Sequence, residues 1–240
     1  AIKSINKEID LPAIAHFKKI LNMGYHYDIV FCIDINNNMM QCMERIKKQL
    51  REFPSKMIRA YAECGKHVSN VRVKIITYGN KIEPDIKESR WFNISDVKGL
   101  EPEYYSAYLR YLRCIDTSGN ALALHAISKA IHTDWTQYEN KKRHHIFVFS
   151  NSKSNFIDVE LFENSKDIWM ETNSGKQKSN NISLSQSSKR LIILAPYVYP
   201  WRELYESWTQ VLYNPLEKDY IEDDIFYLDA VNALIDDIDI

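Results

Sequence analysis

Four runs of apolar residues along the chain predict buried strands. They lie at 27–33 (YDIVFCI), 71–78 (VRVKIITY), 145–150 (HIFVFS) and 191–195 (LIILA), and β-branched residues are frequent in them. Short runs that are apolar almost throughout are typical of strands covered on both faces, as in parallel sheets. Residues 90–94 (RWFNI) predict a shorter additional strand.

The segment after the first run predicts a long amphipathic helix. Its apolar residues recur four and three positions apart, at Met39, Met43, Ile46, Leu50 and Phe53. Charged side chains fill the opposite face, as expected for a helix that covers a core. Pro54 is expected to interrupt this helix, because proline lacks the N–H that bonds to the preceding turn. Helical spacing then resumes as far as Gly65, which suits a helix C-terminus.

Three later segments, 103–112, 120–131 and 201–213, also predict helices. Thr117 or Ser118 is the expected N-cap of the second one. Two groups of aromatic residues lie on these segments. Tyr104, Tyr108 and Tyr111 would share one face of the first helix, and Trp201 and Trp208 would lie two turns apart on the third. Packing is the prediction for both groups, and protein recognition is the alternative for the tyrosines.

The remaining segments complete the pattern. Residues 159–170 are compatible with more than one element, and 172–189, rich in Asn, Ser, Gly, Lys and Gln, predict a long polar loop. Strands therefore alternate with helices, which predicts an α/β fold: a three-layer, Rossmann-like, mainly parallel sheet with helices on both faces. Such a sheet binds ligands at the carboxyl ends of its strands. A single domain is predicted for 1–240, with a core at about 25–215.

Residues 217–240 predict an acidic amphipathic helix. They carry nine acidic side chains against the single Lys218, while apolar residues recur three and four positions apart. We expect this helix to dock through its apolar face, and a partner-binding tail is the alternative. No basic stripe interleaved with aromatics is found, so nucleic acid is not an expected ligand.

Composition places the chain among ordinary globular proteins, with 45% hydrophobic and 26% charged residues and a net charge of −1. No apolar run is long enough to span a membrane, and the first ten residues do not resemble a signal peptide. Cys32, Cys42, Cys64 and Cys114 form neither a CxxC pair nor a zinc motif, so free thiols in a reducing compartment, the cytoplasm, are expected.

Candidate chemistry begins at the end of the first predicted strand. Asp34, Asn36 and Asn38 alternate just before the long helix, so their side chains can point into one turn. Oxygen donors in such a loop suit a hard cation such as Mg²⁺. Hydrogen bonding within an ordinary polar turn is the alternative interpretation of these three residues.

Three segments together resemble the von Willebrand factor A-type family. Phe31 to Met39 is similar to its strand followed by Asp-x-Ser-x-Ser and Met, with Asn36 and Asn38 in place of the serines. Residues 115–122 (IDTSGNAL) resemble its second site segment, where Asp116 or Thr117 would contribute. Residues 148–152 (VFSNS) resemble the third, with Asn151 in place of its usual aspartate.

The resemblance implies a metal-ion-dependent adhesion site with Asp34, Asn36, Asn38, Asp116, Thr117 and Asn151 as metal ligands. There, Mg²⁺ or another divalent cation would leave one position for an acidic side chain of a partner protein. Because Asn36, Asn38 and Asn151 are neutral, only Asp34 and Asp116 would be anionic ligands. A metal-independent scaffold of the same fold is therefore the alternative. Intracellular bacterial members of this family imply a role in signalling.

An enzyme is not expected. The chain contains no GxSxG, GxGxxG, GxxxxGK or HExxH motif, and His144 and His145 lie at no recognisable catalytic spacing. The alternative enzyme is a haloacid dehalogenase-like phosphohydrolase, because that family also presents a nucleophilic aspartate after a strand. Its second carboxylate would fall at position 36, which is Asn36 here.

Overall fold

The computed structural model describes residues 24–80, 86–95, 99–116, 122–136, 142–151, 159–171 and 189–215. The predicted acidic helix at 217–240 and residues 172–188 of the predicted polar loop lie outside this part of the chain.

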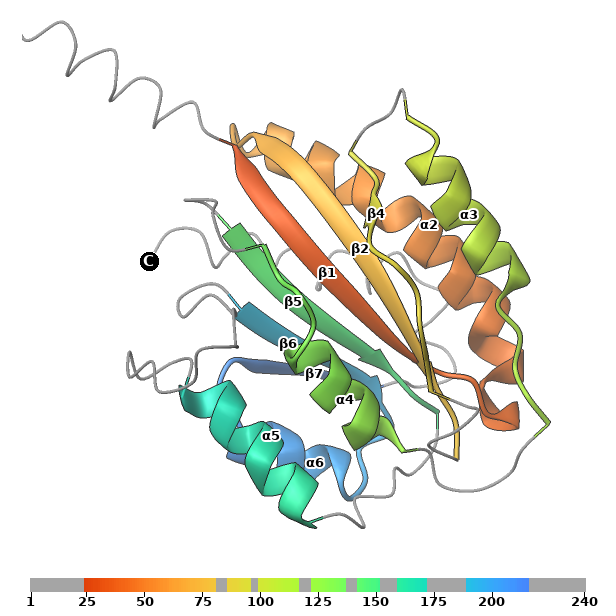
Figure 1. The fold of residues 1–240 in the computed structure, drawn as a ribbon, viewed down its shortest axis with the longest axis vertical. Helices are drawn as coiled ribbons and strands as arrows, with labels where there is room; N and C mark the ends of the chain where they lie inside the picture. Colours follow the sequence, from red (N-terminus) through yellow and green to blue (C-terminus); the bar gives the residue numbers. More distant parts are fainter. Residues whose placement is uncertain are drawn as a thin grey trace, which may run out of the picture.

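A central sheet separates two layers of helices (Figure 1). Within the described residues its seven strands are β1 (Tyr25–Asp34), β2 (Val68–Tyr78), β3 (Lys87–Glu88), β4 (Phe92–Asn93), β5 (Lys142–Phe149), β6 (Lys189–Ala195) and β7 (Val211–Pro215). The helices are the short 3₁₀ helix η1 (Asn37–Met39) and α2 (Met40–Glu63), α3 (Glu101–Tyr111), α4 (Ala123–Ile131), α5 (Val159–Glu171) and α6 (Trp201–Ser207). The predicted α/β fold class is confirmed.

The order of the strands is β3-β2-β1-β5-β6-β7, and β4 also pairs with β2. Strands β2, β1, β5, β6 and β7 are parallel, whereas β3 and β4 run antiparallel to β2. The chain builds outward from β1 to β2 and then returns to β5 on the other side of β1. The carboxyl ends of β1 and β5 therefore flank the switch point at which open α/β sheets bind ligands.

Two cores form because successive strand residues point to opposite faces of the sheet. Phe31 of β1 packs with Phe53 of α2 on one face, where α3 contributes Tyr105 and Leu109. Cys32, the next residue in β1, belongs to the opposite core, together with side chains of α4, α5 and α6. The predicted burial of Cys32 and Cys42 is confirmed.

The prediction that Pro54 interrupts the long helix is wrong, since α2 runs through it without a break. A proline at this position cannot donate to the carbonyl of Leu50, four residues earlier. The buried hydroxyl of Tyr105 donates to that carbonyl instead, at 2.8 Å. The helix ends near Gly65, whose φ of 70° confirms the predicted C-terminus.

Replacing Tyr105 with phenylalanine is expected to destabilise the protein by about 1–2 kcal/mol, because it leaves the Leu50 carbonyl buried without this donor. Urea unfolding measures the difference. In a Pro54→Ala background, where the backbone N–H is restored, the same change should cost less. An equal cost in both backgrounds would contradict the compensation between Tyr105 and Pro54.

Two other predictions need correction. The predicted helix at 201–213 ends at Ser207, and the chain then forms β7, although Trp201 and Trp208 are both buried against the sheet as expected. The helix predicted at 120–131 begins at Ala123 with Leu122 as its N-cap, and the predicted N-caps Thr117 and Ser118 lie outside the described residues. Residues 159–170, left open by the sequence, fall in helix α5.

Candidate functional site

Asp34 lies at the carboxyl end of β1 and is fully buried. One of its carboxylate oxygens, Oδ1, accepts a hydrogen bond from the backbone N–H of Asn36 at 2.9 Å. The other, Oδ2, accepts one from the hydroxyl of Ser150 at 2.9 Å. Ser150 directly follows β5, so Asp34 joins the two strands at the switch point of the sheet.

The three asparagines after Asp34 do not share one environment. Asn36 is fully buried, and its extended backbone lets its carbonyl accept the N–H of Met39 at 2.9 Å, which starts η1. Asn37 and Asn38 are exposed. The sequence predicted that the side chains at 34, 36 and 38 converge, and the structure brings Asp34 and Asn36 together in the buried part of the turn.

Two more segments meet this turn. The backbone N–H of Ile115 donates to the carbonyl of Ile35 at 2.8 Å, which holds the loop after α3 against the end of β1. The exposed Asp116 then accepts a hydrogen bond from the Asn37 amide at 3.4 Å, a long contact. From the other side, the Asn151 amide donates to the carbonyl of Asn38 at 3.0 Å.

Hydrogen bonds therefore join the segments that carry Asp34, Asn36, Asn38, Asp116 and Asn151, five of the six residues predicted as metal ligands, although Asp116 is reached through Asn37. Thr117 lies outside the described residues. Asn38 accepts the hydrogen bond from Asn151 through its main-chain carbonyl, and not through its side-chain amide.

Sequence reasoning missed three contributors to this cluster. Asn37 lies between the alternating positions 36 and 38 that the sequence pattern selects. Ser150 precedes Asn151, the residue that aligns with the aspartate of the family motif. Tyr78, at the end of β2, is fully buried and donates from its hydroxyl to the carbonyl of Phe149 at 3.0 Å. A polar residue at the end of an apolar run, the feature that marked Asp34, also marks Tyr78 and Ser150 and could have identified both, whereas Asn37 has no such signal.

The oxygen atoms around the turn are of the types that a hard cation prefers, because they belong to carboxylate, amide and hydroxyl groups. Their negative charge is low, however, because Asp34 and Asp116 supply the only carboxylates among the described residues of this cluster. Across the described residues, no three His, Cys, Asp or Glu side chains gather as a metal-binding group. Any cation here would be held by Asp34 and Asp116 with neutral oxygens and water, and it would compete with the hydrogen bonds that Asp34 already accepts.

Two thiols lie near the cluster and are unsuited to nucleophilic chemistry. Burial raises the pKa of Cys42 to about 11, and the nearby Cys114 and Asp34 add to the effect. Burial also raises the pKa of Cys114. Both thiols are therefore protonated at neutral pH, whereas a nucleophilic cysteine needs its thiolate.

The two histidines are structural. His144 and His145 are both buried in β5, several residues before its carboxyl end. Desolvation lowers the pKa of His144 to about 4, and that ring packs 4.8 Å from Trp135. The pKa of His145 is also lowered well below its usual value by burial, and its ring stacks on Tyr27.

Comparison with known proteins identifies relatives in fold. No protein-family model matches the chain, and no curated protein matches it. Among solved structures it is similar to proximal thread matrix protein 1 from the mussel byssus, with a TM-score of 0.50 and 11% identity over 89% of this chain and 48% of that one. It is also similar to the pilus adhesin SpaC from Lactobacillus rhamnosus GG, with a TM-score of 0.53 and 9% identity over 89% of this chain and 31% of that one.

These comparisons support the fold. At such low identities the likeness carries no residue roles, and this chain spans less than half the length of either neighbour. None of the helices in the described ranges is both long and apolar enough to cross a bilayer.

Proposed function

We propose that this chain is a non-enzymatic protein-binding module of the von Willebrand A type, with its ligand site at the Asp34 turn. The observation that carries the proposal is the meeting of three segments at the switch point: the turn after β1, the loop after α3 and the loop after β5. Hydrogen bonds join them through Asn37 and Asp116, Asn151 and Asn38, and Asp34 and Ser150. The same three segments carry the family resemblance in the sequence.

The partner we propose is another protein that presents an acidic side chain. A divalent cation, Mg²⁺ in the first instance, would lie between that side chain and the carboxylates of Asp34 and Asp116. Exposed Asn37, Asn38 and Asp116 leave the outer part of the cluster open to such a partner. A pilus adhesin among the structural neighbours accords with a binding role. The buried thiols Cys32 and Cys42 favour the cytoplasm, and bacterial signalling is the setting we propose.

A metal-independent scaffold is the second candidate, and one observation favours it. Both carboxylate oxygens of Asp34 already accept hydrogen bonds, from Asn36 and Ser150. A carboxylate satisfied in this way stabilises the turn without a cation. The two candidates differ only in whether metal binds, so a metal titration separates them.

Millimolar Mg²⁺ or Mn²⁺ is expected to raise the melting temperature by about 2–5 °C, because a ligand that binds only the native state stabilises it. Asp34→Asn, which removes the charge and keeps an acceptor for Asn36, should abolish the shift. Asp167→Asn, at an exposed aspartate on α5, is the matched control and should retain it. No shift in the unaltered protein would favour the metal-independent scaffold.

The phosphohydrolase alternative has its own test. Magnesium-dependent hydrolysis of a generic aryl phosphate that disappears in Asp34→Ala would overturn the binding-module proposal. Asn36, fully buried where that chemistry needs a second carboxylate, supports the expectation of no turnover.

A further inference from the structure

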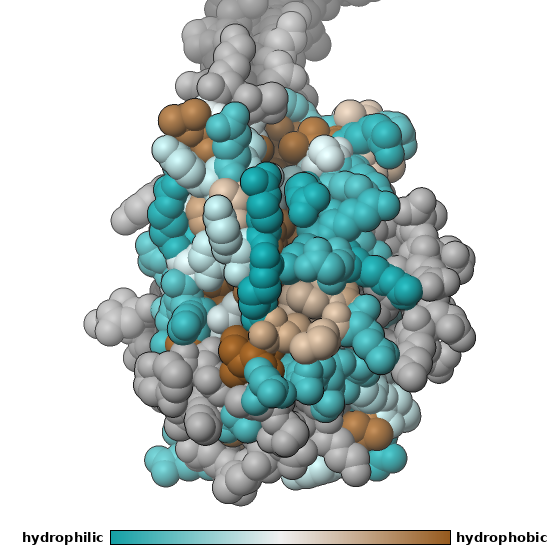
Figure 2. Space-filling view, turned by 90° about the vertical axis from the view of Figure 1, so that its right-hand side faces the viewer, coloured by the Kyte–Doolittle hydropathy of each residue, from teal (hydrophilic) through white to brown (hydrophobic). Residues whose placement is uncertain are grey.

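Helix α3 presents an outward face whose charges are separated along its length. Its first turn carries Glu101 and Glu103, and its last turn carries Arg110. This side of the molecule is largely hydrophilic, with smaller apolar areas among the polar side chains (Figure 2). A shallow pocket on α3 is lined by Pro102, Glu103, Tyr104, Ser106, Ala107 and Arg110.

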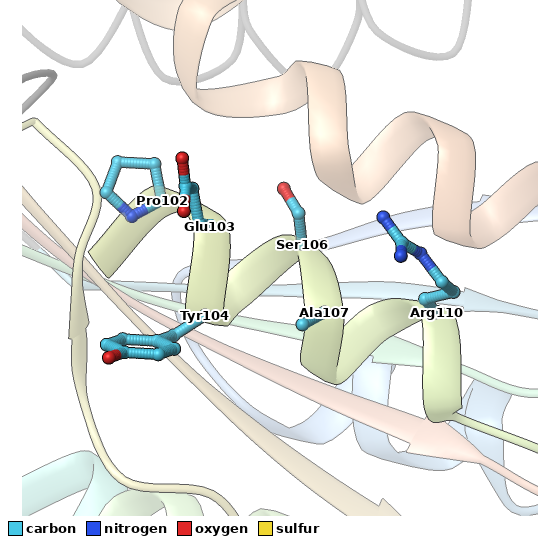
Figure 3. Close-up of a pocket in the computed structure, with 6 residues that line it drawn as sticks. All are labelled: Pro102, Glu103, Tyr104, Ser106, Ala107 and Arg110. Atoms are coloured by element: carbon cyan, nitrogen blue, oxygen red, sulfur yellow. The ribbon is translucent and has the colours of Figure 1, made fainter. Parts of the chain in front are cut away.

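The outward residues of α3 form two parallel pairs. Glu103 and Arg110 are seven residues apart, two helical turns, and so are Tyr104 and Tyr111. Figure 3 shows Glu103, Ser106 and Arg110 on the same side of the helix, with Tyr104 projecting from another side. Ala107, a small residue, lies near the midpoint of both pairs.

These side chains are available for an external contact. Glu103 and Arg110 are exposed, and within the described residues neither forms an ion pair. Tyr104 and Tyr111 are 49% and 76% exposed, unlike the buried Tyr105. The guanidinium of Arg90, which bonds Glu101 at 2.8 Å, lies 5.4 Å over the Tyr104 ring and holds it in place.

We infer that α3 is a self-association surface whose partner is a second copy of this chain. Two α3 helices packed antiparallel about a two-fold axis near Ala107 would place Glu103 of each copy against Arg110 of the other. The same axis brings Tyr104 of each copy to Tyr111 of the other. A surface that complements itself in this way meets the requirement of a two-fold interface, where residue i contacts j and j contacts i. The small Ala107 lets the helices approach closely at the crossing.

The association is weak. Eleven helical residues span roughly 16 Å, too short to bury the area of a stable interface by themselves. We expect a dissociation constant in the micromolar to millimolar range, on the order of 100 µM. Because α3 leads directly into the loop that carries Asp116, a dimer would present two candidate ligand sites together, which strengthens binding to a multivalent partner. The dimer itself does not depend on the proposed function.

Charge reversal tests the inference on the full chain, by sedimentation equilibrium up to about 1 mM protein. Glu103→Arg and Arg110→Glu should each weaken self-association by about tenfold or more, because like charges then face each other. An equimolar mixture of these two variants should associate again, since one copy then carries two arginines and the other two acidic residues. Glu160→Arg, at an exposed glutamate on α5, is the control and should leave association unchanged.

Both altered residues are exposed, so circular dichroism should show folded protein in every case. Monomeric behaviour of the unaltered protein across the whole range would overturn the inference. So would association that persists equally in both single variants, or a mixture that does not associate. A dimer with no metal response would leave this inference intact while the cation-dependent form of the proposed function fails.

Discussion

Replacing Arg72 with methionine is expected to destabilise the protein by about 3 kcal/mol, because it leaves a buried carboxylate without its counter-charge. Asp28 in β1 is 1% exposed and accepts two hydrogen bonds from the Arg72 guanidinium, at 2.8 and 2.6 Å. It also accepts the backbone N–H of Thr136 at 2.6 Å, which ties the loop after α4 to the sheet. The guanidinium further packs 4.6 Å from the Trp91 ring.

A second substitution separates charge from packing in this cluster. Adding Asp28→Asn to Arg72→Met removes the buried charge and keeps an acceptor for Thr136, so part of the lost stability should return. Arg59→Met is the matched control: Arg59 faces Glu63 at 3.9 Å, and both side chains are more than 70% exposed. It should change stability by well under about 1 kcal/mol. A similar loss for Arg59→Met and Arg72→Met in urea unfolding would refute the role of burial.

Replacing Lys189 with methionine is expected to have the opposite effect and stabilise the protein by about 3 kcal/mol at pH 7. Lys189, the first residue of β6, is fully buried, and desolvation lowers the pKa of its amine from 10.5 to about 7. A shift of this size corresponds to roughly 5 kcal/mol. Its amine donates to the carbonyl of Trp169, and losing that bond offsets about 1–2 kcal/mol of the gain.

The pH dependence of unfolding tests whether the buried amine of Lys189 is the cause of this destabilisation. Between pH 7 and 10.5 the unfolded chain holds a proton on Lys189 that the folded chain releases, so stability from this group rises with pH across that window. Lys189→Met should remove this rise, whereas Lys87→Met, at an exposed lysine of β3, should retain it. Urea unfolding at several pH values measures both. A lower stability of Lys189→Met at pH 7 would mean that the amine is charged and well paired in the folded protein.

The central strands could be predicted from sequence because burial on both faces leaves almost no polar residue in them. Residues 27–33 and 191–195 are such runs, and β1 and β6 contain them entirely. Strand β7 could not be predicted in the same way. It is only five residues long, and its tyrosine and asparagine fit a helical pattern as well as a strand. Its pairing with β6 decides its conformation, and that contact is invisible in local periodicity.

The candidate site was predicted in part for a related reason. Asp34 ends β1 and Asn151 follows β5, its parallel neighbour, so topology alone brings them to one edge of the sheet. Which atoms meet there depends on backbone geometry. The hydroxyl of Ser150, one residue before the predicted Asn151, is the group that reaches Asp34, and Asn38 contributes its main-chain carbonyl to the contact with Asn151. A sequence motif predicts which positions along the chain lie at the site, but it does not predict which atoms of those residues make contact.

The hydroxyl of Tyr105 that replaces the missing donor of Pro54 has an evolutionary consequence. Substitutions at these two positions are therefore expected to be coupled. Losing the hydroxyl while the proline remains passes through an intermediate in which the buried Leu50 carbonyl lacks this donor, at a cost of about 1–2 kcal/mol. Replacing the proline first avoids that intermediate, so this order of change is expected to be the easier one.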